Sequence, residues 1–340
     1  MDELWDALEQ TDATRCVVVT DPPSGLRAFI VLDDLTLGPA AGGVRTKRYA
    51  SARHALEDAA MLARAMTLKC ALAGLRAGGG KAVVMEHAAL DRERAFERLG
   101  ERVEELGGIF RTSGDLGTTE QDLAAMARRC QYVSPDVPRL AGAVAAGLLA
   151  CIEACAAHRD RSLSGLKVAV QGVGAVGRAA ATTLATAGAS VIVSDLDEDL
   201  ARQVAAEAGG EICSAQGLLL ADVDVLVPCA TGGVLDEDTA RKLRAWAVCG
   251  AANNVLAGPE VAERLKERDV LHVPDPISSA GGVITGLLPG EQDAEERDRL
   301  LAGLGDTTRA VLERAHAEDV TPARVAESLA WERIRAAAKD

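Results

Sequence analysis

The sequence predicts an α/β protein of two domains, with a doubly wound parallel sheet in the C-terminal domain. The chain has 340 residues, whereas one hydrophobic core usually organises roughly 150. Beyond residue 140, apolar runs of strand length alternate with amphipathic stretches of helix length, which is typical of parallel sheets covered by helices. One apolar run, residues 167–171, leads directly into a glycine-rich turn at residues 172–177.

The N-terminal elements follow in order from their periodicity. Residues 16–20 and 26–32 are apolar runs separated by Asp21-Pro22-Pro23-Ser24-Gly25, which predicts a hairpin. Residues 51–70 have helical spacing, and Ser51 is a suitable N-cap. A short strand at residues 82–85 and two helices complete this part; we expect the helices at about residues 91–106 and 119–129.

The proline-rich stretch at residues 132–138 interrupts this periodicity and predicts the domain boundary. We expect a first domain over residues 1–135, a second over residues 136–320 and a C-terminal helix over residues 321–340. The second domain begins with a helix at about residues 141–158. Its expected strands are nearly continuous apolar runs, which are typical of a parallel sheet buried on both faces: residues 167–171, 190–194, 223–227, 247–249 and 270–273. Two acidic amphipathic helices, residues 292–316 and 321–337, end the chain.

Composition and charge exclude several classes of protein. The formal charge is −14, which repels phosphate backbones, so we expect no nucleic acid partner. Residues 1–5 are not the start of a secretory signal, and no run of 18 apolar residues lacks a charge, so we expect no membrane span. The eight cysteines are scattered away from the histidines, which predicts reduced thiols, no metal site and a cytoplasmic protein.

The glycine-rich turn predicts where a dinucleotide binds. Gly172-Val173-Gly174-Ala175-Val176-Gly177 lies between a predicted strand and a predicted helix, as in a Rossmann-type domain. In that arrangement the helix N-terminus binds the pyrophosphate. Asp195 ends the next strand, where its carboxylate can accept the ribose hydroxyls and repel a 2′-phosphate. We therefore expect NAD rather than NADP; a glycine turn without a ligand is the alternative.

Two lysines and an aspartate of the first domain are candidates for chemistry. Lys69 lies among apolar residues near the end of a helix, where an unpaired ammonium group is costly. Lys81 follows three glycines, which suggests close approach to a ligand, and Asp115 is framed by small residues. One cation can hold a substrate carboxylate, while a second lysine of depressed pKa and a carboxylate move protons. The alternative is that the lysines are surface residues and Asp115 caps a turn.

Several motifs together resemble the glutamate/leucine/phenylalanine/valine dehydrogenase family, and most closely its leucine, valine and phenylalanine branch. The resemblance covers roughly residues 25–335 in the family's order. The motifs are Leu37-Gly38-Pro39-Ala40-Ala41-Gly42-Gly43-Val44-Arg45, Met66-Thr67-Leu68-Lys69, Gly78-Gly79-Gly80-Lys81, Asp115-Leu116-Gly117-Thr118-Thr119, Val170-Gln171-Gly172-Val173-Gly174, Pro228-Cys229-Ala230, Gly250-Ala251-Ala252-Asn253-Asn254 and Ala280-Gly281-Gly282-Val283-Ile284.

This resemblance implies an NAD-linked oxidative deamination of an L-amino acid to a 2-oxo acid and ammonia, in a cleft between the two domains. It implies that Lys69 holds the substrate carboxylate, aided by the backbone N–H groups of Gly42 and Gly43. Lys81 would activate the attacking water, and Asp115 would be the proton partner. Arg45 is a further candidate for a positive pocket in the cleft.

The resemblance also implies cofactor contacts and a homo-oligomer. Cys229, Ala230 and Asn253 match positions that line the bound cofactor. The family's members usually assemble through the first domain, so we expect a homo-oligomer whose partners are small molecules.

Three departures from the family's pattern concern the substrate. The segment 136–147 is shorter than usual, and Ala143–Ala146 offer no hydroxyl where the family has a threonine. Ser279 stands where an asparagine usually precedes Ala-Gly-Gly, with a shorter reach. In the pocket, Ala41 replaces a common leucine, and Ser113 and Gly114 replace a common Ala-Glu pair.

These departures leave the substrate open between two main interpretations. The pocket is reshaped for a bulkier or more polar amino acid than leucine, or the reaction is a variant, such as reduction of another imine or coupling of a 2-oxo acid. A non-catalytic NAD-binding sensor is a third hypothesis, against which stand the retained lysines and aspartate.

Overall fold

The computed structural model describes residues 6, 8, 9, 11, 15–135 and 138–338. It divides into two compact units: the first ends at Val137 and includes the residues from Ala330 onward, and the second runs from Pro138 to Leu329. Two sequence predictions concern residues that lie outside the described ones, namely the absence of a signal at residues 1–5 and the part of the boundary at residues 136–137.

The first unit is built on a six-stranded mixed sheet of order β1-β2-β4-β3-β5-β6. The predicted hairpin is confirmed, because β1 and β2 pair in antiparallel register around the Pro-Pro-Ser-Gly turn. Strand β4 joins the hairpin antiparallel, and β3, β5 and β6 extend the sheet in parallel. The strands are β1 (Arg15–Asp21), β2 (Leu26–Leu32), β3 (Ala40–Lys47), β4 (Gly78–Met85), β5 (Phe110–Gly114) and β6 (Val133–Ser134).

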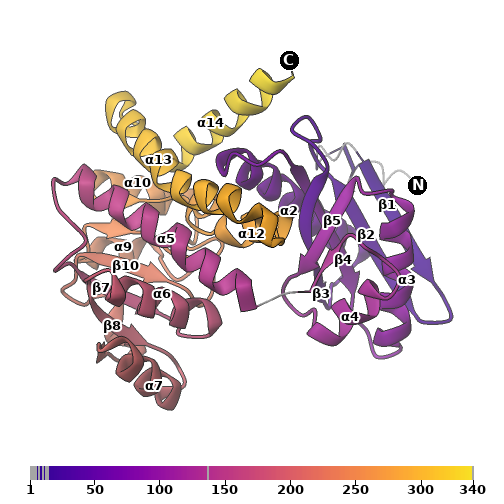
Figure 1. Cartoon of the computed structure of the whole chain (residues 1–340), viewed down its shortest axis with the longest axis horizontal. Coiled ribbons are helices and arrows are strands. Elements are labelled where there is room, and N and C mark those ends of the chain that lie inside the picture. Colours follow the sequence, from indigo (N-terminus) through magenta and orange to yellow (C-terminus); the bar gives the residue numbers. More distant parts are fainter. Residues whose placement is uncertain (1–5, 7, 10, 12–14, 136–137, 339–340) are drawn as a thin grey trace. The chain divides into compact units, whose positions relative to one another are not determined.

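Helices cover both faces of this sheet. Helix α2 (Ala52–Leu72) packs its alanine-rich side on Phe29, Val31 and Val83 of one face, and Ser51 caps it as predicted. Helices α3 (Arg92–Glu105) and α4 (Glu120–Ala127) pack on the other face (Figure 1). Because successive strand residues point to opposite faces, each residue of β3, β4 and β5 is assigned to the α2 face or to the α3 face.

Strands β3 and β4 contain glycines that the sequence does not mark as strand residues. Strand β4 begins four residues earlier than predicted, at Gly78. A Cβ atom on Gly79 would lie 2.2 Å from the Ala63 carbonyl oxygen of α2, and one on Gly42 would lie 1.7 Å from the Gly80 carbonyl oxygen. At these two positions the closely approaching group is therefore the protein's own backbone.

The second unit contains a six-stranded parallel sheet of order β12-β11-β10-β7-β8-β9. The chain runs outward from β7 to one edge and then, from β10, to the other, which is the order of a Rossmann-type sheet. Strands β7 and β8 span the residues predicted for them. The strands are β7 (Lys167–Gln171), β8 (Ser190–Ser194), β9 (Glu211–Ile212), β10 (Val225–Pro228), β11 (Ala247–Val248) and β12 (Leu271–His272).

Helices cover this sheet on both faces, so the predicted doubly wound architecture is confirmed. The core of one face includes residues of α9 and α10, and α5 packs with α6, α12 and α13 (Figure 1). The helices are α5 (Pro138–His158), α6 (Ala175–Thr186), α7 (Glu198–Ala208), α8 (Ala215–Leu218), α9 (Glu237–Lys242), α10 (Pro259–Glu267), α11 (Asp275–Ser278), α12 (Gly281–Leu287), the 3₁₀ helix η1 (Glu291–Asp293), α13 (Ala294–Glu318) and α14 (Pro322–Ala337).

Helix α5 is long and apolar enough to cross a membrane, by length and composition alone, with a mean hydropathy of 2.0 over residues 140–158. Half of this stretch is buried inside the protein. Leu148, Cys151, Ile152 and Cys155 are fully buried, and the helix packs on α6, α12 and α13. This is the environment of a core helix, and the helix also contains Ala143–Ala146 of the shortened segment.

Candidate active site

The glycine turn of the second unit has two crowded glycines and one that faces open space. Gly172 has a φ of +81°, which favours glycine, and a Cβ atom there would lie 2.5 Å from the Ala230 Cβ. A Cβ atom on Gly177 would lie 1.8 Å from the Gly172 carbonyl oxygen, so this glycine allows helix and strand to approach. At Gly174, in contrast, an added Cβ would meet no protein atom within 4 Å. The space beside Gly174 is therefore the space a ligand can occupy.

The N-terminus of α6 adjoins this space. Gly174 is the N-cap residue and Ala175 and Val176 begin the helix, and no side chain caps its first N–H groups. Unpaired N–H groups and the positive end of the helix dipole attract phosphate oxygens. The residues present therefore fit a dinucleotide.

Asp195 lies beside the same turn, at the end of β8. Its two carboxylate oxygens accept the N–H groups of Val173, at 2.7 Å, and Asp197, at 3.0 Å. A carboxylate oxygen can accept more than one hydrogen bond, so both oxygens can also accept ribose hydroxyls. The first of these bonds joins Asp195 directly to the glycine turn.

The other predicted cofactor residues follow β10 and β11. Cys229 and Ala230 come directly after β10 and pack on Gly172 and Gly177, because their atoms are the ones that an added Cβ would meet. Burial raises the pKa of the Cys229 thiol to about 12, so this side chain is an uncharged contact surface and no nucleophile.

Asn253 and Ser279 lie together in the second unit, with 3.5 Å between the Ser279 Oγ and the Asn253 Oδ1. The Ser279 hydroxyl also donates to the Asp275 carbonyl oxygen at 2.6 Å, across one turn of chain. Both partners are acceptor oxygens, so the single hydroxyl hydrogen of Ser279 serves one of them at a time, and the bond to Asp275 is the shorter.

In the first unit, the structure brings Lys81 and Asp115 together. Lys81 lies in β4 and is 6% exposed, while Asp115 follows the last residue of β5. The Lys81 Nζ is 2.7 Å from the Asp115 Oδ2, and the Arg45 Nε from β3 is 2.9 Å from the same oxygen. Asp115 therefore sits between two cations from neighbouring strands.

Burial and charge shift the pKa values of this pair. Burial lowers the pKa of Lys81 below its usual range although the Asp115 charge acts to raise it, and the Arg45 charge lowers it further. Burial alone would raise the pKa of Asp115, but the charges of Lys81 and Arg45 outweigh this effect and lower it to about 2. The site thus contains a lysine poised to lose its proton beside a carboxylate that stays ionised.

The backbone around Asp115 is held by β3. Gly117 has a φ of +76°, and an added Cβ would lie 1.8 Å from the Thr46 carbonyl oxygen. The Thr46 N–H donates to the Leu116 carbonyl oxygen at 2.9 Å, and the Thr118 hydroxyl donates to the Val44 carbonyl oxygen at 2.7 Å. These bonds fix the turn in which the carboxylate is carried.

The α2 face of the sheet gathers most of the predicted substrate residues. An added Cβ on Gly43 would lie 2.9 Å from the Asp115 Cβ, so Gly43 faces Asp115. Ala41 precedes Gly43 by two residues on β3, and Ser113 of β5 is paired with Gly43, so both share this face. Gly42 points to the opposite face, toward Gly80.

Lys69 lies on α2, in its last turn and half-buried. The same helix approaches β4 at Gly79, where an added Cβ would be 2.2 Å from the Thr67 backbone nitrogen. Thus Lys69 is two residues from a contact with the strand that holds Lys81.

Asp58 and Tyr49 also belong to the charged cluster around Arg45, and no sequence motif indicated them.

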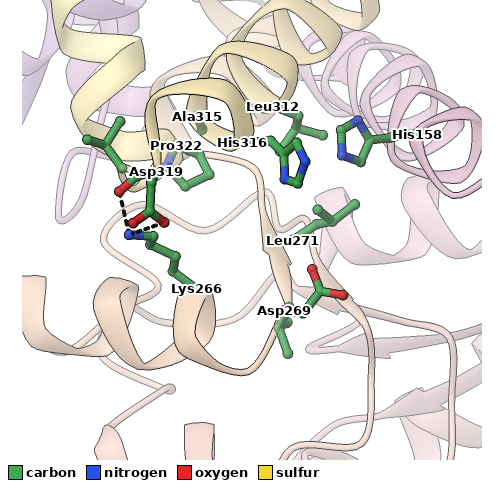
Figure 2. Close-up of a pocket in the computed structure, with 11 residues that line it drawn as sticks. His158, Lys266, Asp269, Leu271, Leu312, Ala315, His316, Asp319 and Pro322 are labelled. Atoms are coloured by element: carbon green, nitrogen blue, oxygen red, sulfur yellow. Dashed lines mark hydrogen bonds and ion pairs between the residues drawn. The ribbon is translucent and has the colours of Figure 1, made fainter.

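Figure 2 shows a cavity of the second unit, lined in part by Lys266 and Asp319. It has a volume of about 150 Å³, and His158, Leu271 and His316 are among its lining residues. Leu271 is the first residue of β12, whereas the glycine turn follows the last residue of β7. Because these strands are parallel, the cavity lies where the strands begin and the glycine turn lies where they end. The lining ammonium of Lys266 is 2.8 Å from the Asp319 carboxylate. This cavity is therefore separate from the predicted dinucleotide site.

Comparison with known proteins assigns the family. The family model described as "Glu/Leu/Phe/Val dehydrogenase, dimerisation domain" matches residues 13–132, and that described as "Glutamate/Leucine/Phenylalanine/Valine dehydrogenase" matches residues 197–340. Members of this family are dehydrogenases that use a nicotinamide cofactor.

Similar proteins cover nearly the whole chain. Valine dehydrogenase of Streptomyces coelicolor is 36% identical over 96% of this chain and 93% of that protein. Leucine dehydrogenase of Thermoactinomyces intermedius is 34% identical over 98% of this chain and 93% of that protein. Phenylalanine dehydrogenase of Lysinibacillus sphaericus is 36% identical over 88% of this chain and 82% of that protein.

Two solved structures show the same similarity in three dimensions. L-tryptophan dehydrogenase from Nostoc punctiforme superposes with a TM-score of 0.88 at 31% identity, covering 99% of this chain and 100% of that one. A hetero-hexameric glutamate dehydrogenase from Thermus thermophilus, in a Leu-bound form, superposes with a TM-score of 0.73 at 26% identity, covering 99% and 95%. The chain therefore belongs to the glutamate/leucine/phenylalanine/valine dehydrogenase family and is an amino acid dehydrogenase, an oxidoreductase acting on CH–NH₂ groups.

Proposed function

We propose that this enzyme catalyses the NAD-dependent oxidative deamination of a branched-chain or aromatic L-amino acid to the 2-oxo acid and ammonia, and the reverse reductive amination. The observation that carries the proposal is the buried Lys81 ammonium, 2.7 Å from the Asp115 carboxylate. A lysine whose pKa is lowered by burial gives up its proton more readily than a solvated lysine, which suits the role of a base. A carboxylate that remains ionised can receive protons from a neighbouring group.

In this mechanism Lys69 binds the substrate carboxylate, with the backbone N–H groups of Gly42 and Gly43 as further donors. NAD, when bound, accepts the hydride that leaves the substrate Cα. Lys81 takes a proton from the water that adds to the resulting imine carbon, which gives a carbinolamine. Asp115 receives a proton from the substrate amino group or from Lys81, and returns one to the nitrogen as ammonia leaves. The carbinolamine hydroxyl loses its proton as the C–N bond breaks, so an ammonium substrate gives a 2-oxo acid, the ammonium ion, reduced cofactor and one proton.

The second unit supplies the cofactor site in this proposal. Gly172, Val173, Gly174, Ala175, Val176 and Gly177 would hold the pyrophosphate, and Cys229, Ala230 and Asn253 would line the rest of the site. Asp195 favours NAD over NADP, because its carboxylate at the end of β8 can accept ribose hydroxyls but repels a 2′-phosphate.

The substrate pocket is proposed to take a large side chain. Ala41 and Ser113 share the α2 face with Lys81, where the family commonly has leucine and alanine, and Ser279 is a further candidate for substrate binding. A leucine exchanged for alanine removes three carbon atoms and opens volume for a larger substrate. The match to an L-tryptophan dehydrogenase also supports an aromatic substrate.

We further propose functional limits and an assembly. Residues 1–135 form the substrate and oligomerisation domain, residues 136–320 the NAD domain, and residues 321–340 a C-terminal helix. The description of the first family model as a dimerisation domain supports a homo-oligomer, and the hetero-hexameric glutamate dehydrogenase among the similar structures supports assembly into an oligomer more generally. The eight cysteines are free thiols, which suits a reducing, cytoplasmic compartment.

The test is a panel of L-amino acids with NAD and with NADP, followed through formation of reduced cofactor. We expect turnover of an aromatic or branched-chain member with NAD and much weaker turnover with NADP. Stronger activity with NADP would contradict the role of Asp195. Absence of activity on every member would contradict the proposed substrate class.

One alternative reaction has support in particular residues. Ser279 and Ala143–Ala146 replace an asparagine and a threonine usual in the family, so substrate orientation differs while Lys81 and Asp115 remain. A variant reaction on another imine or 2-oxo acid would then give no turnover on the panel but would consume NADH with the right 2-oxo acid and amine. Tight NADH binding without any turnover would favour a non-catalytic sensor.

A further inference from the structure

A chain of ion pairs continues behind Asp115, away from Lys81. The Arg45 guanidinium joins two carboxylates: its Nε is 2.9 Å from the Asp115 Oδ2, and its Nη1 is 3.4 Å from the Asp58 Oδ1. The Arg45 side chain is 17% exposed and that of Asp58 12% exposed. The Arg45 guanidinium is thus held between two carboxylates and is largely shielded from water.

Asp58 is itself fixed by two residues, one at the end of β3 and one just beyond it. The Tyr49 hydroxyl donates to the Asp58 Oδ2 at 2.5 Å, and the Lys47 Nζ lies 3.6 Å from the same oxygen. Burial, together with the hydrogen bond to Asp58, raises the pKa of Tyr49 far above its usual range, so the phenol keeps its proton and acts as a donor. The Lys47 ammonium also lies 4.8 Å from the centre of the Tyr49 ring.

Lys81 and Arg45 both contact the same carboxylate oxygen of Asp115, so either cation can compensate its charge. A lysine that is the only partner of a buried carboxylate keeps its proton, because losing it leaves the carboxylate uncompensated. Arginine stays charged at every working pH, so it compensates the carboxylate after the lysine has lost its proton. With Arg45 in place, Lys81 can alternate between its charged and neutral forms without leaving the Asp115 carboxylate uncompensated, and Asp115 stays in position.

We propose that Arg45 is a positioning residue for the Lys81–Asp115 pair: it holds the Asp115 carboxylate and carries its counter-charge while Lys81 is neutral, and Asp58 and Tyr49 hold Arg45. This role rests on the proposed amino acid deamination, in which Lys81 works as a base.

The charged groups around Lys81 come from three elements. Asp115 follows β5, Arg45 lies on β3, and α2 carries Asp58 and, further along, Lys69. On β2 the residue paired with Lys81 is Val31, which carries no charge. Arg45 is in direct contact with Asp115, whereas Lys47 lies beside Asp58.

The test compares the pH dependence of kcat/KM for amino acid oxidation in the full-length wild type, Arg45→Gln, Arg45→Lys and Tyr49→Phe. Arg53→Gln is the matched control, because Arg53 forms an ion pair with Glu57 on the exposed side of α2, the helix that carries Asp58. Binding of NADH and the thermal unfolding temperature are measured for each variant.

Removing the Arg45 charge raises the pKa of Lys81, so a smaller fraction of Lys81 is neutral at a given pH. In Arg45→Gln we expect the acid limb of the profile to move to higher pH. We also expect kcat/KM to fall roughly 10- to 100-fold at neutral pH, recovering in part at alkaline pH. Tyr49→Phe should also move the acid limb to higher pH, by less than Arg45→Gln does. Arg45→Lys should restore part of the loss, since it keeps the charge but cannot bridge both carboxylates.

A folded Arg45→Gln enzyme with the wild-type profile, or with an equal loss at every pH, would overturn the proposal. If Arg45→Gln does not fold, unchanged profiles in both Arg45→Lys and Tyr49→Phe overturn it instead. Failure of the proposed function is seen separately, because the wild type would then oxidise no amino acid before any variant is compared.

Discussion

The substitution Gly174→Ala separates a ligand-binding glycine from glycines that the fold itself requires. Gly174 has a φ of −59°, which alanine adopts readily, and the added Cβ meets no protein atom within 4 Å. Alanine is a poorer N-cap than glycine, so we expect a loss of about 0.5–1 kcal/mol in the free energy of unfolding. For a domain of this size that loss corresponds to roughly 1–4 °C in the unfolding temperature.

The same methyl group occupies the space into which we place the cofactor pyrophosphate. We expect NADH affinity to fall at least about tenfold, equivalent to ~1.4 kcal/mol. Gly172→Ala is the contrasting variant, because its φ is +81° and its Cβ would lie 2.5 Å from the Ala230 Cβ. Left-handed backbone and overpacking together should destabilise it by roughly 2–5 kcal/mol.

The assay is a fluorescence titration with NADH beside a thermal unfolding curve, for the wild type and both variants. The expected result is that Gly174→Ala loses NADH binding while its unfolding temperature stays close to that of the wild type. Wild-type NADH affinity in a folded Gly174→Ala protein would refute it, and would favour a glycine turn that binds no phosphate.

Three further predictions concern the first unit. Lys69→Ala should raise the KM for the amino acid roughly 10- to 100-fold, since a charge-assisted hydrogen bond is lost, and an unchanged KM would count against its role. Ala41→Leu should lower kcat/KM for an aromatic substrate about tenfold or more relative to a smaller one; steady-state kinetics on both substrates check this, with thermal unfolding as a control for overpacking. The Asp115 pKa is lowered from 3.8 to about 2, so its contribution to stability is present at neutral pH and is lost as pH falls through that range. Denaturant titrations across this range should show that the wild type loses about 2 kcal/mol of unfolding free energy on acidification and that Asp115→Asn does not. Equal losses in the two proteins would contradict the ion pairs of Asp115 with Lys81 and Arg45.

The parts of the fold that the sequence predicts are those with a clear hydrophobic period. Strands β7 and β8 are continuous apolar runs next to a glycine turn, so their limits and their parallel pairing follow from the pattern. The hairpin of β1 and β2 follows from its Pro-Pro-Ser-Gly turn. Strands β3 and β5 were not predicted, because Gly42 and Gly43, and the polar run Arg111-Thr112-Ser113, have the composition of loops. Their strand structure depends on close packing with neighbouring backbone, which no local pattern records.

The same division applies to the candidate site. Lys81, Asp115 and the glycine turn carry motifs, and the structure gives them the contacts that their chemistry needs. The pairing of Arg45 with Asp115 joins residues 70 positions apart in the sequence. The bond from Tyr49 to Asp58 depends on how β3 leads into α2. Such contacts are set by strand register, so the residue types alone could not place Asp58 or Tyr49 in the cluster.

The central claim is that Lys81 and Asp115 carry out the deamination of an amino acid. The most direct measurement is the stoichiometry of products: NADH, 2-oxo acid and ammonia, quantified in the same reaction for the wild type and for Lys81→Ala. We predict equal amounts of all three from the wild type, and none above background from a Lys81→Ala protein that still binds NADH. NADH formed without matching ammonia, or near-normal product formation by Lys81→Ala, would contradict this account.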